Sequence, residues 1–153
     1  MKKAIYSVMS AALMLSAISC NSDDDSSSTT STTEISNAVA AGAWRVTYFM
    51  DSDADETAHF TGYNFTFGSN NVLTATNGTN TYTGIWNVST EDPTDDNPNL
   101  ADIDFDIIFN APVDFTDLTE DWEIIERTAT KLRLKHVSGG DGSVDYLTFE
   151  KNA

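Results

Sequence analysis

Apolar and polar side chains alternate along several short stretches of this chain, and the alternation limits the fold more than any other feature. Ile103, Phe105 and Ile107 occupy alternate positions, with an aspartate before each of them. A β-strand turns successive side chains to opposite faces, so this pattern predicts a strand with one apolar and one wet face. Runs rich in Thr, Tyr, Phe, Ile and Val predict further strands. We expect eight strands, at 44–50, 59–67, 72–76, 80–89, 100–109, 122–128, 131–137 and 144–151.

The links between these strands indicate how neighbours pair. Asn77 and Gly78 are the strongest hairpin signal, because a type I′ turn needs positive φ at both central positions. Slightly longer turns stand at 68–71 and 138–142. Successive short links favour antiparallel neighbours. Helical turns are expected at 36–41 and 114–118, and long links at 51–58, 90–99 and 110–121.

A sheet of this size with one apolar face must close on itself or fold over to bury that face. We therefore predict an all-β domain, an eight-stranded antiparallel up-and-down barrel preceded by a short helix. A two-sheet sandwich is the alternative. The segment 34–153 is long enough to bury its core as one domain.

The N-terminal segment has the pattern of a secretory signal. Lys2 and Lys3 precede an uncharged apolar run at 4–18, which is shorter than the roughly 18 to 20 residues that span a membrane as a helix. Cys20, the only cysteine, follows directly in a context that resembles the lipobox of bacterial lipoproteins. We expect 1–19 to be a signal peptide and Cys20 to carry the acyl chains (palmitate among them) of a membrane anchor. An acyl anchor needs more than one chain to be stable.

A polar tract separates this cysteine from the domain. Residues 20–33 are rich in Asp, Ser and Thr and cannot form a core, which predicts a disordered tether. The aspartates at 23–25 resemble a surface-export signal of Bacteroidetes lipoproteins. The corresponding expectation is a lipoprotein of the outer membrane, at the cell surface of a Gram-negative bacterium.

The charge of the chain is strongly negative. Without residues 1–19 it keeps 6 basic and 24 acidic residues, a net charge of −18. Such a surface is repelled by phosphate backbones, so nucleic acid is excluded as a partner. The same charge is repelled by anionic lipid head groups, so the membrane is expected as a partner only through the lipid anchor. The domain is expected to be a monomer.

Gly42 and Trp44 form a Gly-x-Trp motif after the first helical turn, and this motif resembles the start of a lipocalin, in which the Trp plugs the closed end of the barrel. More widely, the chain resembles lipocalin-like lipoproteins of Flavobacteria. This resemblance rests on Trp44-Arg45-Val46, residues 60–67, Gly84-Ile85-Trp86, Asp121-Trp122 and residues 139–142. It implies the barrel fold, structural roles for Gly42 and Trp44 and a place at the cell surface, and it implies no established activity.

The sequence offers little material for catalysis. His59 and His136 are the only imidazoles, and neither stands in a nucleophile or metal-protease motif. We therefore expect no enzyme and no resident cofactor. Asp51, Asp53 and Asp55 alternate as in the opening of a calcium loop, which leaves a weak Ca²⁺ site open beside the interpretation as a solvated acidic loop.

Aromatic residues on the expected inner face suggest a ligand site. Tyr48, Tyr63, Tyr82 and Trp86 are the predicted lining, since a buried tyrosine hydroxyl needs a partner and suits a partly polar cavity. Two functions remain open at this point. One is the binding of a small hydrophobic or amphipathic ligand inside a hollow barrel. The other is a filled, non-enzymatic interaction or structural module that binds a protein or glycan through its loops.

Overall fold

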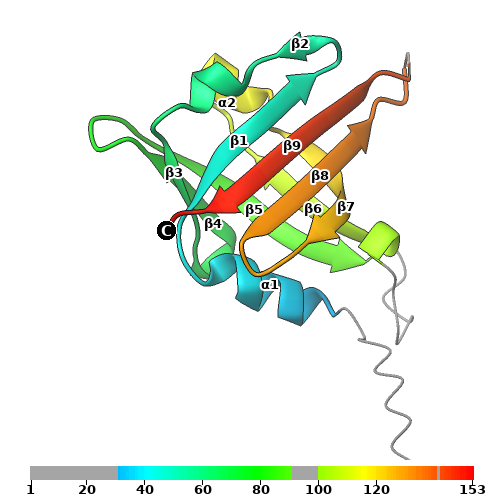
Figure 1. Ribbon diagram of the computed structural model, residues 1–153, viewed down its shortest axis with the longest axis horizontal. Coiled ribbons are helices and arrows are strands. Elements are labelled where there is room, and N and C mark those ends of the chain that lie inside the picture. The colour runs from blue at the N-terminus through cyan, green and yellow to red at the C-terminus, as the bar shows by residue number, and fades with distance from the viewer. Residues whose placement is uncertain (1–30, 91–99, 141) are drawn as a thin grey trace, which may run out of the picture.

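The computed structural model describes residues 31–90, 100–140 and 142–153, and in them the chain forms one closed antiparallel sheet (Figure 1). Its order is β2-β1-β3-β4-β5-β6-β7-β8-β9, and β9 pairs with β1 to close the barrel. The elements are α1 (Thr32–Ala40), β1 (Trp44–Asp51), β2 (Ala54–Asp55), η1 (Thr57–Phe60), β3 (Asn64–Phe67), η2 (Ser69–Asn71), β4 (Val72–Thr76), β5 (Thr81–Thr90), η3 (Leu100–Asp102), β6 (Ile103–Ile108), α2 (Val113–Thr116), β7 (Glu120–Arg127), β8 (Lys131–Val137) and β9 (Val144–Lys151). The predicted all-β, eight-stranded up-and-down barrel is confirmed, with β2 as a two-residue addition to the end of β1.

Two predicted strands are too long. The segment expected at 59–67 forms a strand only at Asn64–Phe67, because the turn η1 directs Phe60 into the core and Gly62 follows with φ 84°. The segment expected at 100–109 begins with η3, so its strand runs from Ile103 to Ile108.

The Asn77-Gly78 hairpin forms, but its turn is not type I′. The loop spans 77–80 between the paired residues Thr76 and Thr81, and within it only Gly78 has positive φ. Asn77 instead uses its side-chain oxygen to accept bonds from the backbone N–H groups of Thr79 and Asn80. This local bonding replaces the second positive φ that a two-residue turn requires.

The first helix begins earlier than predicted. Ser31 caps α1 by accepting a bond from the N–H of Glu34 at 3.2 Å, so Thr32 and Thr33, expected in the tether, belong to the helix. The expected signal peptide, Cys20 and the rest of the tether lie outside the described residues. In the described ranges no helix has the length and apolarity needed to cross a membrane.

Aromatic rings fill the barrel. Most neighbouring rings are in edge or tilted contact, as between Phe65 and Phe149 at 5.3 Å and between Phe67 and Phe105 at 5.5 Å. Such rings give cores both area and preferred geometry. The largest fully buried side chains include Trp44, Trp122, Phe49, Phe60, Phe65, Phe67, Phe105, Phe109, Phe115 and Phe149.

Side chains also cover both ends of the barrel. The helix α1 lies across one end (Figure 1) and buries Ile35 and Val39. Beside it, Trp44 is buried and donates from its indole N–H to the Val39 carbonyl at 2.7 Å. At the opposite end Phe60 and Phe115, from η1 and α2, meet with ring centroids 5.2 Å apart. Apolar side chains therefore occupy this end of the barrel as well.

Candidate functional site

The structure does not bring the four predicted ligand residues together. Tyr63 and Tyr82 stack at 5.8 Å near the α2 end, and contact with the Tyr63 side chain raises the pKa of Tyr82. Trp86 lies farther along β5, bonds through its indole N–H to the Gly68 carbonyl, and borders a groove between α1 and residues 68–71. These side chains pack against other elements and do not surround one cavity.

Tyr48 points away from the interior, contrary to the sequence prediction. The register of β1 against β9 pairs Val46 with Phe149 but Tyr48 with Thr148, so Thr47 is an extra residue in β1. A β-bulge of this kind shifts the inside–outside alternation by one residue. Phe49 therefore faces inward in place of Tyr48, which is 38% exposed on the outer surface.

A second bulge lies on the same side of the barrel. In β7, Ile124 pairs with Leu134 and Glu126 with Arg133, which leaves Ile125 as the extra residue. Ile125 is exposed on the outer face. The two bulges thus flank the β8–β9 pair, one on each neighbouring strand.

A groove of about 380 Å³ lies between these bulges on the outer face of β7, β8, β9 and β1. We call it the outer groove. Ligand pockets commonly enclose roughly 300 to 1,000 Å³. Thr148, only 9% exposed, is the one buried polar residue of the described part of the core and belongs to the groove wall. The residues around it are Thr47, Tyr48, Ile125, Lys131, Arg133, Leu134, Tyr146, Thr148 and Glu150.

The outer groove differs in charge from the rest of the molecule. All six basic residues after position 3 stand on β1, β7, β8 and β9: Arg45, Arg127, Lys131, Arg133, Lys135 and Lys151. Its lining has two cations, Lys131 and Arg133, and one anion, Glu150. Arg133 pairs with Glu126 at 2.9 Å, while Lys131 and Arg45 share Glu150 at 3.5 and 3.9 Å. On a chain of net charge −16, the basic residues of the described ranges are thus gathered on this face.

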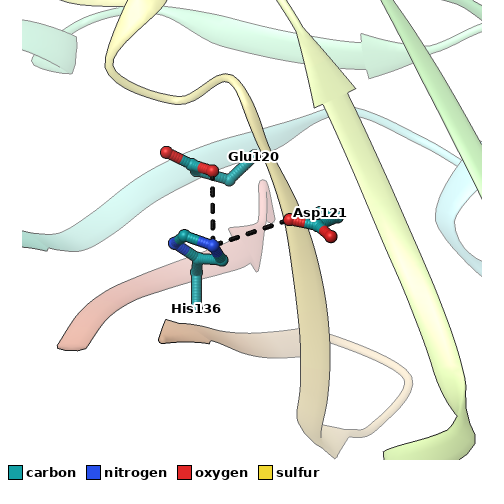
Figure 2. Close-up of side chains that lie close together, drawn as sticks. All are labelled: Glu120, Asp121 and His136. Atoms are coloured by element: carbon teal, nitrogen blue, oxygen red, sulfur yellow. Dashed lines mark ion pairs between the residues drawn. The ribbon is translucent and has the colours of Figure 1, made fainter. Parts of the chain in front are cut away.

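A second cluster lies at the end of the barrel where β7 begins and β8 ends (Figure 2). The Nε2 atom of His136 is 3.4 Å from a carboxylate oxygen of Glu120 and 3.5 Å from one of Asp121. On the other side of the ring, Nδ1 is 3.4 Å from a carboxylate oxygen of Asp145. We call these four residues the rim cluster.

Strand alternation explains how three of the four residues of the rim cluster meet. Glu120, His136 and Asp145 continue the inward-facing rows of Trp122, Leu134 and Leu147 by one further position each, at the barrel rim. His136 and Asp145 are directly paired between β8 and β9, and the His136 ring packs edge-on against Trp122 at 6.2 Å.

Burial raises the pKa of Glu120, the His136 ring lowers it, and Asp121, Asp145 and Asp51 raise it further. Asp145 also accepts a bond from the backbone N–H of Ser52 at 2.7 Å, which ties the β1–β2 turn to the cluster. The rim cluster is thus partly desolvated and rich in negative charge.

The predicted calcium residues Asp51, Asp53 and Asp55 lie in the β1–β2 hairpin, at the end of β1, in the turn and at the end of β2. Asp55 accepts a bond from the Thr57 N–H at 3.0 Å, and its bonds with Thr57 lower its pKa. Among the described residues, the grouping of three or more potential metal ligands comprises Glu120, Asp121 and His136, and it does not contain Asp51, Asp53 or Asp55. Glu120, Asp121 and His136 were not among the site residues predicted from the sequence.

Comparison of the chain with protein-family models, with curated proteins and with solved structures found no match. The function of this chain is therefore inferred from its own geometry.

Proposed function

We propose that this protein is a non-enzymatic, surface-anchored binding module, and that its outer groove binds an anionic carbohydrate. The observation that carries the proposal is the pair of β-bulges around the groove. Bulges re-aim side chains and are over-represented beside functional sites. Here the bulge in β1 places Tyr48 on the outer face, and the bulge in β7 lies at the outward-facing Ile125; both residues line the groove with Tyr146, Lys131 and Arg133.

The chemistry of the lining supports a ligand that is both polar and amphipathic. Tyr48 and Tyr146 supply rigid rings with hydroxyl tips, which suit the apolar faces and hydroxyl groups of sugars. The guanidinium of Arg133 has five donors arranged in a fork that matches a carboxylate. Exposed ion pairs contribute only about 0 to 1 kcal/mol, so a ligand carboxylate can replace Glu126 or Glu150 at small cost.

The barrel interior gives less support to the alternative, a small apolar ligand held inside. Inside the barrel, Phe65 and Phe105 are fully buried and contact other rings. The filled interior favours the interaction module over the hollow ligand carrier.

Calorimetric titration tests the carbohydrate proposal. The probes are an oligogalacturonate and a neutral malto-oligosaccharide of equal length. We expect the acidic probe to bind at least tenfold more tightly, and Arg133→Ala and Tyr146→Ala each to weaken it at least tenfold, or about 1.4 kcal/mol. Lys135→Gln is the matched control, because Lys135 is a cation of β8 outside the groove lining, and it should change affinity less than twofold.

Several outcomes would contradict this function. Equal binding of both oligosaccharides would contradict a role of charge in ligand selection. Binding of neither oligosaccharide would contradict a carbohydrate ligand. Tighter binding of a polyglutamate peptide than of oligogalacturonate would assign the groove to a protein partner. Saturable binding of a fluorescent fatty acid, with no effect of Arg133→Ala, would favour an interior apolar ligand.

The place of action is a separate part of the proposal. Cys20 in its lipobox-like context and the acidic tract after it support a lipoprotein of the outer membrane. Fractionation of producing cells should find the protein with membranes and Cys20→Ser in the soluble fraction, with Ser22→Ala as the control. Retention of Cys20→Ser in the membrane fraction would contradict the anchor.

A further inference from the structure

We propose that the rim cluster is a divalent transition-metal site, in which Glu120, Asp121 and His136 bind Zn²⁺ and Asp145 orients the imidazole. The inference is independent of the carbohydrate proposal, because the rim cluster and the outer groove share no residue.

The distances fit a tetrahedral ion. Zinc lies about 2.0 to 2.2 Å from imidazole nitrogen and carboxylate oxygen, so ligand atoms of a tetrahedral site stand about 3.3 to 3.6 Å apart. The Nε2 atom of His136 is 3.4 Å from the Glu120 oxygen and 3.5 Å from the Asp121 oxygen. All three ligand atoms lie within 4.8 Å of one another.

The two ring nitrogens of His136 have different carboxylate partners, and this arrangement suits a histidine that binds a metal ion. When Nδ1–H donates to Asp145, the lone pair that binds a metal is on Nε2. Nε2 faces the carboxylates of Glu120 and Asp121 (Figure 2). These carboxylates form ion pairs with a protonated ring, and with a neutral ring they can share a divalent cation. A carboxylate on the second nitrogen of a ligating histidine is the usual outer-shell partner of zinc sites.

The ligand set and the fold specify the class of ion. One imidazole with two carboxylates suits zinc-like cations, whereas Ca²⁺ prefers six to eight oxygens. Three protein ligands leave a fourth position, which is open on the solvent side because Asp121 is exposed at 74%. The ligands come from two adjacent strands, so the site is held by the sheet.

His59 provides a matched control. It also lies beside two carboxylates, with Nδ1 at 3.5 Å from Glu56 and 4.0 Å from Asp114, but it is more exposed than His136, at 43% against 18%. If substitution of His136 weakens Zn²⁺ binding and substitution of His59 does not, the ion binds at the rim cluster and is not held by the general acidity of the surface.

Calorimetry with Zn²⁺ alone, on the whole chain made without an affinity tag, tests the site. Every protein carries Cys20→Ser, which removes the only thiol. We expect one equivalent to bind, His136→Ala to weaken binding at least 100-fold, and Asp145→Asn to weaken it 10- to 100-fold. His59→Ala should change it less than twofold, and Ca²⁺ at equal concentration should not compete.

A second measurement keeps the test valid if a variant is unstable. Circular dichroism checks that each variant folds, and Glu120→Gln, which keeps the shape of the side chain, should also weaken Zn²⁺ at least tenfold. Zinc should raise the melting temperature of the parent but not of His136→Ala, since a ligand of the folded state stabilises it by mass action. Equal Zn²⁺ affinity in the parent and His136→Ala, or no binding to the parent, overturns the inference.

Discussion

The ring of Phe115 on α2 stacks on the ring of Phe65 on β3, with centroids 5.9 Å apart and planes at 21°. Phe115 also contacts the rings of Tyr63, Tyr82 and Phe109 at 4.9 to 5.2 Å. One residue of a four-residue helix thus joins β3, β5, the segment before β3 and the residue that follows β6. The end of the barrel is closed mainly by this side chain.

Replacing this ring should strongly destabilise the domain. Phe115→Ala removes a fully buried aromatic side chain, and such changes cost about 3 to 5 kcal/mol because the cavity collapses only in part. Urea unfolding followed by circular dichroism measures the loss. Val113→Ala, in the same helix but at a position 75% exposed, should change stability by no more than about 0.5 kcal/mol. A similar loss for both variants would contradict the role of Phe115 as the closing side chain.

The same substitution should create a binding cavity. An apolar cavity lined by rings stays dry and accepts small apolar molecules. Phe115→Ala should therefore bind a fluorescent naphthalene probe at least tenfold more tightly than the parent protein, as measured by probe emission. Equal binding to the parent would show that the interior already accepts such ligands, and would restore the hollow-barrel interpretation.

Much of the fold was predictable from alternation and turn residues. The strands at Val72–Thr76, Lys131–Val137 and Val144–Lys151 have the predicted bounds, and Ile103, Phe105 and Ile107 face inward as expected. The start of α1 had a signal that the sequence analysis passed over: Ser31 and Glu34 have the spacing of a capping box within a polar Ser/Thr tract. The reduced strand at 59–67 depends on Phe60 reaching Phe115, a tertiary contact with no local signal.

The sites were less predictable, for two physical reasons. The bulge at Thr47 shifts the face of Tyr48, and no residue type in that stretch marks an extra residue. The rim cluster collects residues from three strands, so it becomes visible only when the strand order is known. Once the strand order is known, the next inward-facing positions at the barrel rim on β7, β8 and β9 are Glu120, His136 and Asp145.

Gly84 should not tolerate a side chain. A Cβ at this buried position of β5 would overlap the carbonyl oxygen of Ile108 and lie 2.9 Å from the Phe109 ring. Overpacking of this kind costs about 1 to 3 kcal/mol, so Gly84→Ala should lower the urea midpoint clearly. Gly139→Ala is the control, because nothing lies within 4 Å of its Cβ position. Equal midpoints for the two variants would contradict the close approach of β5 and β6.

Trp44 should tie α1 to the barrel. Trp44→Phe removes the donor to the Val39 carbonyl, and a buried acceptor left without its partner costs about 1 to 3 kcal/mol. The loss should appear locally, as faster amide hydrogen exchange in α1, at Ile35 and Val39, than in the β8–β9 pair. Uniformly faster exchange in both regions would indicate a general loss of stability and contradict this tie.

Asp117, which follows α2, should make stability depend on pH. Burial raises the pKa of Asp117, Asp51 and Asp114 raise it further, and His59 lowers it. A raised pKa in the folded state means that the folded state holds this proton more tightly, a stabilisation fully present below the unfolded-state pKa and lost as pH rises through the folded-state pKa. Ionised Asp117 is thus unfavourable at pH 7, and Asp117→Asn should raise stability there by about 0.5 kcal/mol, a small gain because the side chain is exposed.

The gain should vanish at pH 3, where both proteins are uncharged at this position. Urea midpoints at pH 3, 5 and 7 measure it, with Asp53→Asn as a control for net charge; an equal gain from Asp53→Asn would assign the effect to overall repulsion and not to the surroundings of Asp117.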